Sequence, residues 1–153
     1  MNTITAAITA VGAYVPDFVL SNQVLETMVD TNDEWITART GIKERRILKD
    51  ADKGTSYLAI QAAKDLIAKA NIDPLEIDMI IMATATPDMM VASTGVYVAT
   101  EIGATNAFSY DLQAACSSFL YGMSTAAAYV QSGRYKKVLL IGADKMSSIV
   151  DYT

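Results

Sequence analysis

The chain of 153 residues contains no histidine and a single cysteine, Cys116. With one cysteine no disulfide can form within the chain, and this usage is typical of a cytoplasmic protein. Metal sites usually need histidine or several cysteines, so we expect no metal site. A cysteine nucleophile normally has a base beside it, most often histidine. Any chemistry at Cys116 must therefore take its acid/base partner from outside this chain.

Long apolar runs and a basic surface are also missing. No run of eighteen apolar residues occurs, so we expect no membrane span, and the first residues lack the basic stretch that begins a signal peptide. The formal net charge is −5, which argues against a nucleic-acid partner. Apolar residues nevertheless make up 52 % of the chain, enough for the core of one domain.

Predicted strands and helices alternate along the chain. Strands are predicted where apolar residues run together or alternate with small polar ones, and helices where apolar residues recur every three or four positions. Alternation of this kind predicts an α/β fold with a mainly parallel sheet covered by helices on both faces. The expected strands are 4–11, 78–84, 107–110 and 137–143, and the expected helices are 21–28, 31–41, 54–71, 94–102 and 116–131.

Cys116 lies where a predicted strand turns into a predicted helix. Unpaired backbone N–H groups at a helix start carry partial positive charge, which favours a thiolate over a thiol. Small residues on both sides, Ala114, Ala115, Ser117 and Ser118, leave room for a substrate to reach the sulfur. The alternative is an inert cysteine, since free cysteine is usually buried as a small hydrophobe. The position favours a nucleophile.

Trp35 and Arg39 are four residues apart in a predicted helix and share one face of it. A capping box of Thr31 and Glu34 is expected to begin this helix, and Gly41 to end it. In one interpretation Trp35 packs into the core with Arg39 over it as a cation–π partner. In the other the pair presents a stacking plane and a guanidinium suited to a nucleotide. The basic group at 43–46 is expected to be solvated.

Three stretches resemble β-ketoacyl-acyl-carrier-protein synthase III, the initiating condensing enzyme of type II fatty acid synthesis in the thiolase-like superfamily. They are residues 30–46, 109–122 and 129–144. The resemblance implies that residues 1–153 are the N-terminal half of a thiolase-like fold, with a sheet of the five-stranded type that is incomplete at its C-terminal end. It also implies that the C-terminal half, with its histidine and asparagine, is absent from this chain.

By this resemblance Cys116 is the catalytic nucleophile, which accepts an acyl group from acyl-CoA as a thioester. Its backbone N–H contributes to the oxyanion hole. Trp35 stacks on the adenine of CoA, and Arg39 and Thr31 contact the nucleotide end. Acyl-CoA enters as a substrate, and no permanently bound cofactor is implied.

Two positions depart from the pattern that the family commonly shows. Val91 stands where relatives often carry a bulky aromatic that lines the acyl pocket of the neighbouring subunit. A smaller wall there, preceded by Met89 and Met90, predicts acyl primers longer or more branched than acetyl. Ser118 stands where relatives commonly have glycine, so we expect a change in the shape of the acyl pocket.

The implied reaction is acyl transfer to the cysteine, followed by decarboxylative condensation with malonyl-acyl-carrier protein. This chain alone is expected to be inactive in condensation. Its expected partners are a C-terminal half, as a separate chain or a missing segment, acyl-carrier protein, and a second copy in a homodimer. Two alternatives stay open. One is another thiolase-like condensing enzyme, such as a 3-hydroxy-3-methylglutaryl-CoA synthase or a specialised priming synthase, and the other is a non-catalytic half-subunit that only dimerises.

Overall fold

The computed structural model describes residues 4–151, within which the chain divides into two compact units. The first comprises the chain up to Tyr14 together with Lys53–Asp144, and the second comprises Val15–Asp52 together with the chain from Lys145 onward. Residues 1–3 and 152–153 of the expected 1–153 range lie outside the described residues. Each unit is described by itself.

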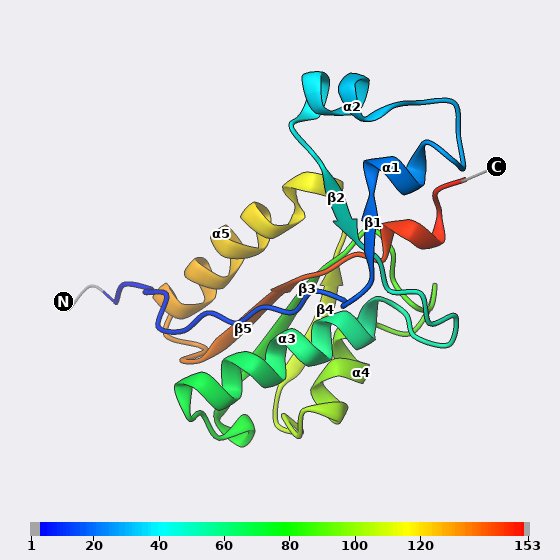
Figure 1. Ribbon diagram of the computed structural model, residues 1–153. Coiled ribbons are helices and arrows are strands. Elements are labelled where there is room, and N and C mark those ends of the chain that lie inside the picture. The colour runs from blue at the N-terminus through cyan, green and yellow to red at the C-terminus, as the bar shows by residue number, and fades with distance from the viewer. Residues whose placement is uncertain (1–3, 152–153) are drawn as a thin grey trace. The chain divides into compact units, whose positions relative to one another are not determined.

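A parallel sheet forms the centre of the first unit (Figure 1). Strand β3 (Met79–Ala83) lies between β4 (Phe108–Leu112) and β5 (Val138–Gly142), and pairs with both in parallel. Every residue of β3 is buried, as its continuous apolar run predicts for a strand covered on both faces. The predicted α/β class is confirmed. Within the described residues the sheet has three strands, in place of the five of the expected type.

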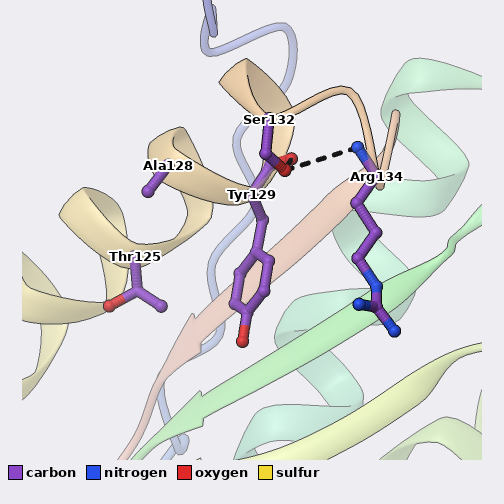
Figure 2. Close-up of a pocket in the computed structure, with 5 residues that line it drawn as sticks. All are labelled: Thr125, Ala128, Tyr129, Ser132 and Arg134. Atoms are coloured by element: carbon purple, nitrogen blue, oxygen red, sulfur yellow. Dashed lines mark hydrogen bonds between the residues drawn. The ribbon is translucent and has the colours of Figure 1, made fainter.

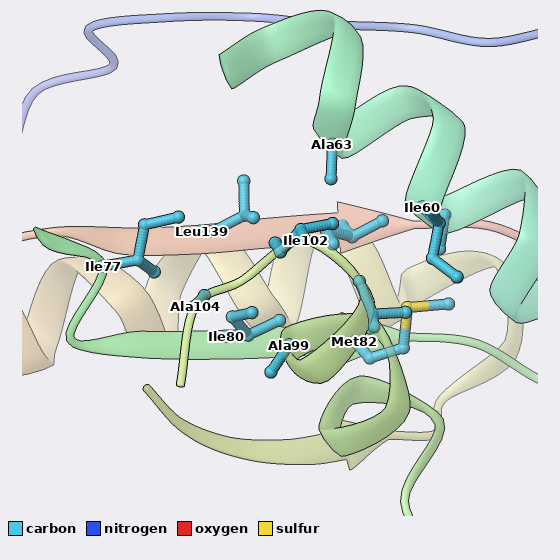
Figure 3. Packing of buried hydrophobic residues seen from close by; sticks show 12 residues of the cluster. Ile60, Ala63, Ile77, Ile80, Met82, Ala99, Ile102, Ala104 and Leu139 are labelled. Carbon is cyan, nitrogen blue, oxygen red and sulfur yellow. The ribbon is translucent and has the colours of Figure 1, made fainter. Parts of the chain in front are cut away.

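Three helices cover this sheet. Helices α3 (Thr55–Ala70) and α4 (Thr94–Glu101) lie on one face, and α5 (Ser118–Gln131) lies on the other (Figure 1). The buried core lies between the sheet and the first two helices (Figure 3), and its members include Ala59, Ile60, Ala63, Ile80, Met82, Val98, Ala99, Leu139 and Ile141. Burial of each isoleucine, leucine, valine or methionine side chain in it contributes about 1.5–3 kcal/mol, which makes this cluster the main stabilising feature of the unit.

Helix α5 approaches the opposite face of the sheet closely because Gly122 has no side chain. A Cβ atom at Gly122 would lie 2.5 Å from Cδ1 of Leu140 and 3.6 Å from Cγ2 of Ile81. The helix follows β4 after a short connection, so its first turn stands at the end of that strand. This is the connection that carries Cys116.

The ends of α3 follow the sequence prediction. Gly54 is its N-cap and Asn71 its C-cap, the latter in the left-handed region with φ 50°. A short 3₁₀ helix, η1 (Pro74–Glu76), then leads to β3. Asp78 joins the starts of two strands, because its Oδ2 accepts hydrogen bonds from the backbone N–H groups of Lys137 and Lys136. These bonds lower the pKa of the Asp78 carboxyl, since they favour its charged form.

The second unit contains β1 (Val19–Ser21), α1 (Asn22–Leu25), α2 (Asp33–Thr40), β2 (Glu44–Arg46) and a 3₁₀ turn, η3 (Met146–Ser148). The two strands pair antiparallel. The fully buried Asn22 joins these elements, because its Nδ2 donates to Oδ1 of Asp33 at 2.6 Å and to the Ile42 carbonyl at 2.8 Å.

The basic group at 43–46 was expected to be solvated. Arg46, whose side chain is 42 % exposed, agrees with this expectation, whereas Arg45 is partly buried and does not. Arg45 donates a hydrogen bond to Oδ1 of Asn22, and Arg46 donates to the Pro16 carbonyl at 3.2 Å. Both arginines lie in β2. Their guanidinium groups serve as hydrogen-bond donors within the second unit, a role that a count of charges does not reveal.

The strand expected at 4–11 is not formed, and residues 4–16 have no regular secondary structure. Ile8 and Val11 are 74 % and 73 % exposed, and no strand among the described residues pairs with the segment. A strand needs such a neighbour for its backbone groups. The segment is held to α3 by a 2.9 Å hydrogen bond from the Ala13 N–H to Asp65.

No helix in the described range 4–151 is both long enough and apolar enough to cross a membrane.

Candidate functional site

Cys116 lies exposed in a single 3₁₀ turn, η2 (Ala115–Ser117), between β4 and α5. The α-helix begins at Ser118, two residues later than the sequence predicted. The first hydrogen bond of the turn runs from the Ser117 N–H to the Ala114 carbonyl at 3.1 Å. The N–H groups of Ala115 and Cys116 therefore precede the first bonded donor of the turn, and they have no acceptor within it. The sulfur and these donors share one short segment.

The backbone just before Cys116 adopts an uncommon conformation. Ala115 has φ 47°, in the left-handed region that residues with a Cβ rarely occupy, and Ala114 has φ −150° and ψ 35°. Ser118 spans this pair, because its Oγ accepts from the Ala114 N–H at 2.8 Å and donates to the Ala115 carbonyl at 2.7 Å. The Ser118 side chain is thus hydrogen-bonded to both residues that precede the cysteine.

Val91 stands in the loop between β3 and α4. It is 100 % exposed, as is the neighbouring Met90. Both ends of this loop are fixed by carboxylates. Asp88 accepts from the Ser56 N–H at the start of α3, and Asp111 accepts from Ser93 Oγ and from the N–H groups of Thr94 and Gly95 at 2.8–2.9 Å. Apolar side chains therefore project from a loop that is hydrogen-bonded to the start of α3 near one end and to Asp111 of β4 at the other.

Sequence reasoning missed the structural role of these carboxylates. Asp111 lies near the end of β4 and caps α4, while Asp144 follows β5. Oδ1 of Asp144 accepts from Thr84 Oγ1, from Thr86 Oγ1, and from the N–H groups of Ala85 and Thr86, at 2.7–3.0 Å. No local pattern indicated these bonds, because β4 and β5 lie on opposite sides of β3 and each carboxylate binds loop residues that are distant in sequence.

In the second unit, α2 brings Trp35 and Arg39 together as their spacing predicts. Cζ of Arg39 lies 4.8 Å from the centre of the Trp35 ring. Trp35 is 54 % exposed, so the interpretation in which it packs into the core is wrong, although the cation–π contact itself is present. The exposed pair leaves an aromatic plane and a guanidinium available on the surface of this unit.

The start of α2 differs from the predicted capping box. Its N-cap is Asn32, whose Oδ1 accepts from the Trp35 N–H at 2.8 Å, and Thr31 stands one residue earlier. Asparagine is at least as good an N-cap as threonine, which explains the shift by one position. Gly41 ends the helix with φ 71°, as predicted. Thr31 therefore lies beside the start of the helix that carries Trp35 and Arg39.

A hollow of about 530 Å³ lies at the far end of α5, and no predicted site residue lines it (Figure 2). It is lined by Thr125, Ala128, Tyr129, Ser132 and Arg134. Ser132 Oγ accepts from the Arg134 N–H at 3.4 Å.

Two further observations concern titratable groups and metal sites. Burial, with a smaller effect of Tyr129, raises the pKa of the Tyr110 hydroxyl. Among residues 4–151 there is no group of three or more acidic, histidine or cysteine side chains that could hold a metal ion.

Comparison with known proteins links these features to one family. The family model for 3-oxoacyl-[acyl-carrier-protein (ACP)] synthase III matches residues 110–153, which include the Cys116 turn. The chain is 54 % identical, over all of its 153 residues, to β-ketoacyl-[acyl-carrier-protein] synthase III 2 of Bacteroides thetaiotaomicron. The match covers 46 % of that relative. The chain thus spans about half the length of the curated relatives it matches.

Solved structures agree with the sequence matches. The 3-oxoacyl-[acyl-carrier-protein] synthase III from Aquifex aeolicus superposes with a TM-score of 0.90 at 45 % identity, over 99 % of this chain and 47 % of that one. The priming β-ketosynthase from the R1128 polyketide biosynthetic pathway superposes with a TM-score of 0.89 at 36 % identity, over 94 % of this chain and 42 % of that one. The chain is homologous to the N-terminal half of β-ketoacyl-[acyl-carrier-protein] synthase III, in the thiolase-like superfamily.

Proposed function

We propose that this chain is the acyl-accepting half of a β-ketoacyl-acyl-carrier-protein synthase III, with Cys116 as its nucleophile. The observation that carries the proposal is the exposure of Cys116 in the turn at the start of α5. The thiolate attacks the carbonyl carbon of an acyl-CoA thioester. The bond from that carbon to the Cys116 sulfur forms, the bond to the CoA sulfur breaks, and CoA leaves as a thiolate that takes up a proton.

The backbone around Cys116 supports the tetrahedral intermediate of this step. Negative charge develops on the carbonyl oxygen when sulfur attacks, and backbone N–H groups aimed at that oxygen stabilise it. The Cys116 N–H belongs to the donors at the start of the turn. We assign it to the oxyanion hole. Because the donor and the nucleophile belong to the same residue, their spacing is set by covalent geometry.

Trp35, Arg39 and Thr31 are proposed to bind the nucleotide end of CoA. An exposed indole offers a face for an adenine ring, and a guanidinium suits a phosphate group. The contact between Trp35 and Arg39 supports this assignment, since each side chain limits the movement of the other. Acyl-CoA serves as a substrate in this scheme and no bound cofactor takes part.

Substitution of Trp35 by alanine should raise the KM for acyl-CoA by about tenfold and leave kcat nearly unchanged. Stacking of an aromatic side chain on a base is worth about 1–3 kcal/mol, and an adenine far from the reacting carbon contributes binding alone. Steady-state condensation kinetics with acetyl-CoA, in the protein together with its complementary half, would measure both constants. The Trp35→Phe variant, which keeps an aromatic face, serves as the control and should show a smaller rise. An unchanged KM in Trp35→Ala would contradict the assignment.

The exposed apolar side chains at the start of α5 support the proposal that this chain associates with a partner. Leu120 is 63 % exposed, and Phe119, Tyr121 and Met123 beside it are also exposed. We propose that the complementary C-terminal half covers them, and that it supplies the histidine and asparagine that condensation requires. Acyl-carrier protein as the malonyl donor, and a second copy in a homodimer, complete the proposed set of partners.

Val91 is proposed to line the acyl pocket of the neighbouring subunit. Its full exposure supports this role, because a side chain on the loop surface is free to enter another molecule. Valine fills less space than a bulky aromatic, so primers longer or more branched than acetyl should acylate Cys116 at least as fast as acetyl. Acylation rates with acetyl-CoA, butyryl-CoA and isobutyryl-CoA would test this. A strict acetyl preference would contradict it, and Val91→Phe is the matched control that should restore such a preference.

The likeness to a priming β-ketosynthase of a polyketide pathway supports a second candidate. In that function the same cysteine accepts a starter acyl group for a polyketide. Acylation of Cys116 is common to both functions. The carrier protein that delivers the malonyl group in the condensation assay distinguishes them.

A further inference from the structure

The turn before Cys116 combines an uncommon backbone conformation with a side chain that bonds to both of its residues. Ala115 has φ 47°, although it carries a Cβ. Ser118, in the first turn of α5, is only 3 % exposed, and its hydroxyl bonds to the Ala114 N–H and to the Ala115 carbonyl. Residues with a Cβ keep such a conformation only where their surroundings impose it.

We propose that Ser118 is a positioning residue for Cys116, which it holds in place by fixing the backbone of Ala114 and Ala115. The proposal rests on the proposed function only in taking Cys116 as the nucleophile. Ser118 needs no contact with the substrate in this role. Its hydroxyl acts through the backbone of the residue that directly precedes the cysteine.

The bonding pattern explains how one hydroxyl controls this turn. The Ala114 carbonyl already accepts from the Ser117 N–H, and the Ala115 carbonyl accepts from the Ser118 N–H. The Ser118 hydroxyl adds a bond to each residue, one as acceptor and one as donor, so both alanines are linked to the first turn of α5. The peptide that joins Ala115 to Cys116 cannot rotate without breaking these bonds. That peptide carries the Cys116 N–H, so its orientation sets both the sulfur and the proposed oxyanion donor.

Loss of a serine at the start of an ordinary helix would have a different consequence. Serine in the first turn of a helix often bonds a carbonyl three residues earlier, and its loss then lowers stability alone. Here the bonded carbonyl belongs to a residue with positive φ. Release of that residue would let it return to an ordinary conformation and turn the following peptide away. Substitution of Ser118 should therefore slow the chemistry at Cys116, and this loss should be reversed by a residue that takes positive φ freely.

The experiment compares Ser118→Ala with the double variant Ala115→Gly/Ser118→Ala in the protein together with its complementary half. Two rates are measured at Cys116 by peptide mass spectrometry: acylation by acetyl-CoA and alkylation by iodoacetamide. We expect Ser118→Ala to lower the acylation rate constant by about tenfold or more, at an unchanged half-saturating concentration of acetyl-CoA. Glycine adopts positive φ without strain, so the double variant should regain most of the lost rate.

Ser124→Ala is the matched control. Ser124 lies on the same helix and donates to the Leu120 carbonyl at 3.2 Å, so this variant also loses a bond from a hydroxyl to a carbonyl, but two turns away from Cys116. It should acylate at the original rate. The proposal is overturned if Ser118→Ala acylates as fast as this control, or if the double variant does not regain the rate. If Ser118→Ala does not fold, the double variant must recover both folding and reactivity, and failure of either overturns the proposal.

Alkylation separates this proposal from the proposed function. Iodoacetamide reacts with the sulfur and needs no CoA site, so its rate reports on Cys116 alone. If acetyl-CoA gives no adduct in the original protein, the proposed function fails, while a slower alkylation in Ser118→Ala that glycine at position 115 reverses still supports the positioning role. Equal alkylation rates in all variants would overturn the positioning role even if acylation by acetyl-CoA is observed.

Discussion

Substitution of Cys116 by alanine is expected to abolish acyl-enzyme formation, with a fall in the acylation rate of at least about a thousandfold. Cys116 is the only cysteine of the chain, and it is exposed in the turn before α5. Without its sulfur no atom at this position can form the thioester. Incubation of the protein with acetyl-CoA, followed by digestion and mass spectrometry, would locate the acyl group on the peptide that contains residue 116.

Two outcomes would contradict this assignment. Persistence of the adduct in Cys116→Ala would place the nucleophile elsewhere, and absence of any adduct in the original protein would favour a half-subunit that only dimerises. Ser124→Ala, which changes the same helix away from the turn, is the control for indirect effects on α5. It should leave the adduct intact. Cys116→Ser should also lose the thioester, because a hydroxyl is a much weaker nucleophile than a thiolate at neutral pH.

The 153-residue chain by itself is expected to give no measurable β-ketoacyl product from acetyl-CoA and malonyl-acyl-carrier protein. It has no histidine, and a positioned general acid or base typically contributes about 10²–10⁴-fold to a rate. Decarboxylation of the malonyl group also needs donors for the developing charge, which we assign to the C-terminal half. Addition of that half as a separate chain should restore condensation, measured as incorporation of labelled malonyl carbon into product.

The same pair of chains tests the proposed interface. The exposed apolar side chains of α5 should be covered on association, so size-exclusion chromatography should show a complex of the two chains. A mixture that contains Cys116→Ala is the matched control and should associate without forming product. Condensation by the 153-residue chain alone would contradict the proposed division of labour. A stable monomer that unfolds cooperatively and does not bind the second half would contradict the interface.

The sequence predicted most elements of the first unit because their patterns are local. The apolar run at 78–84 became β3, and the helix expected at 54–71 became α3 (Thr55–Ala70), with Gly54 and Asn71 as its caps. The prediction of a strand at 4–11 was wrong, because a strand also needs a neighbouring strand to pair with its backbone groups, and no described strand pairs with this segment. The expectation that Arg45 is solvated was also wrong, because its hydrogen-bond partner Asn22 lies 23 positions earlier in the chain and no local pattern connects the two residues.

The sequence predicted part of the arrangement of the candidate site residues. The spacing of Trp35 and Arg39 predicts their contact, and the small residues around Cys116 predict an accessible sulfur, as found. Nothing in the spacing indicated that Trp35 is exposed. The bonds of Asp111 and Asp144 were equally hidden, because each carboxylate binds residues of a loop that is distant in sequence.

Residue types and their spacing alone determined that this chain has one possible sulfur nucleophile, no histidine to assist it, and the alternation of strands and helices that places it at a helix start. Only the tertiary structure decided the backbone conformation around that cysteine. The positive φ of Ala115 and the two bonds of the Ser118 hydroxyl depend on how the chain turns between β4 and α5. Dihedral angles and bonds of this kind follow from packing of the whole unit, so no local pattern of residues specifies them.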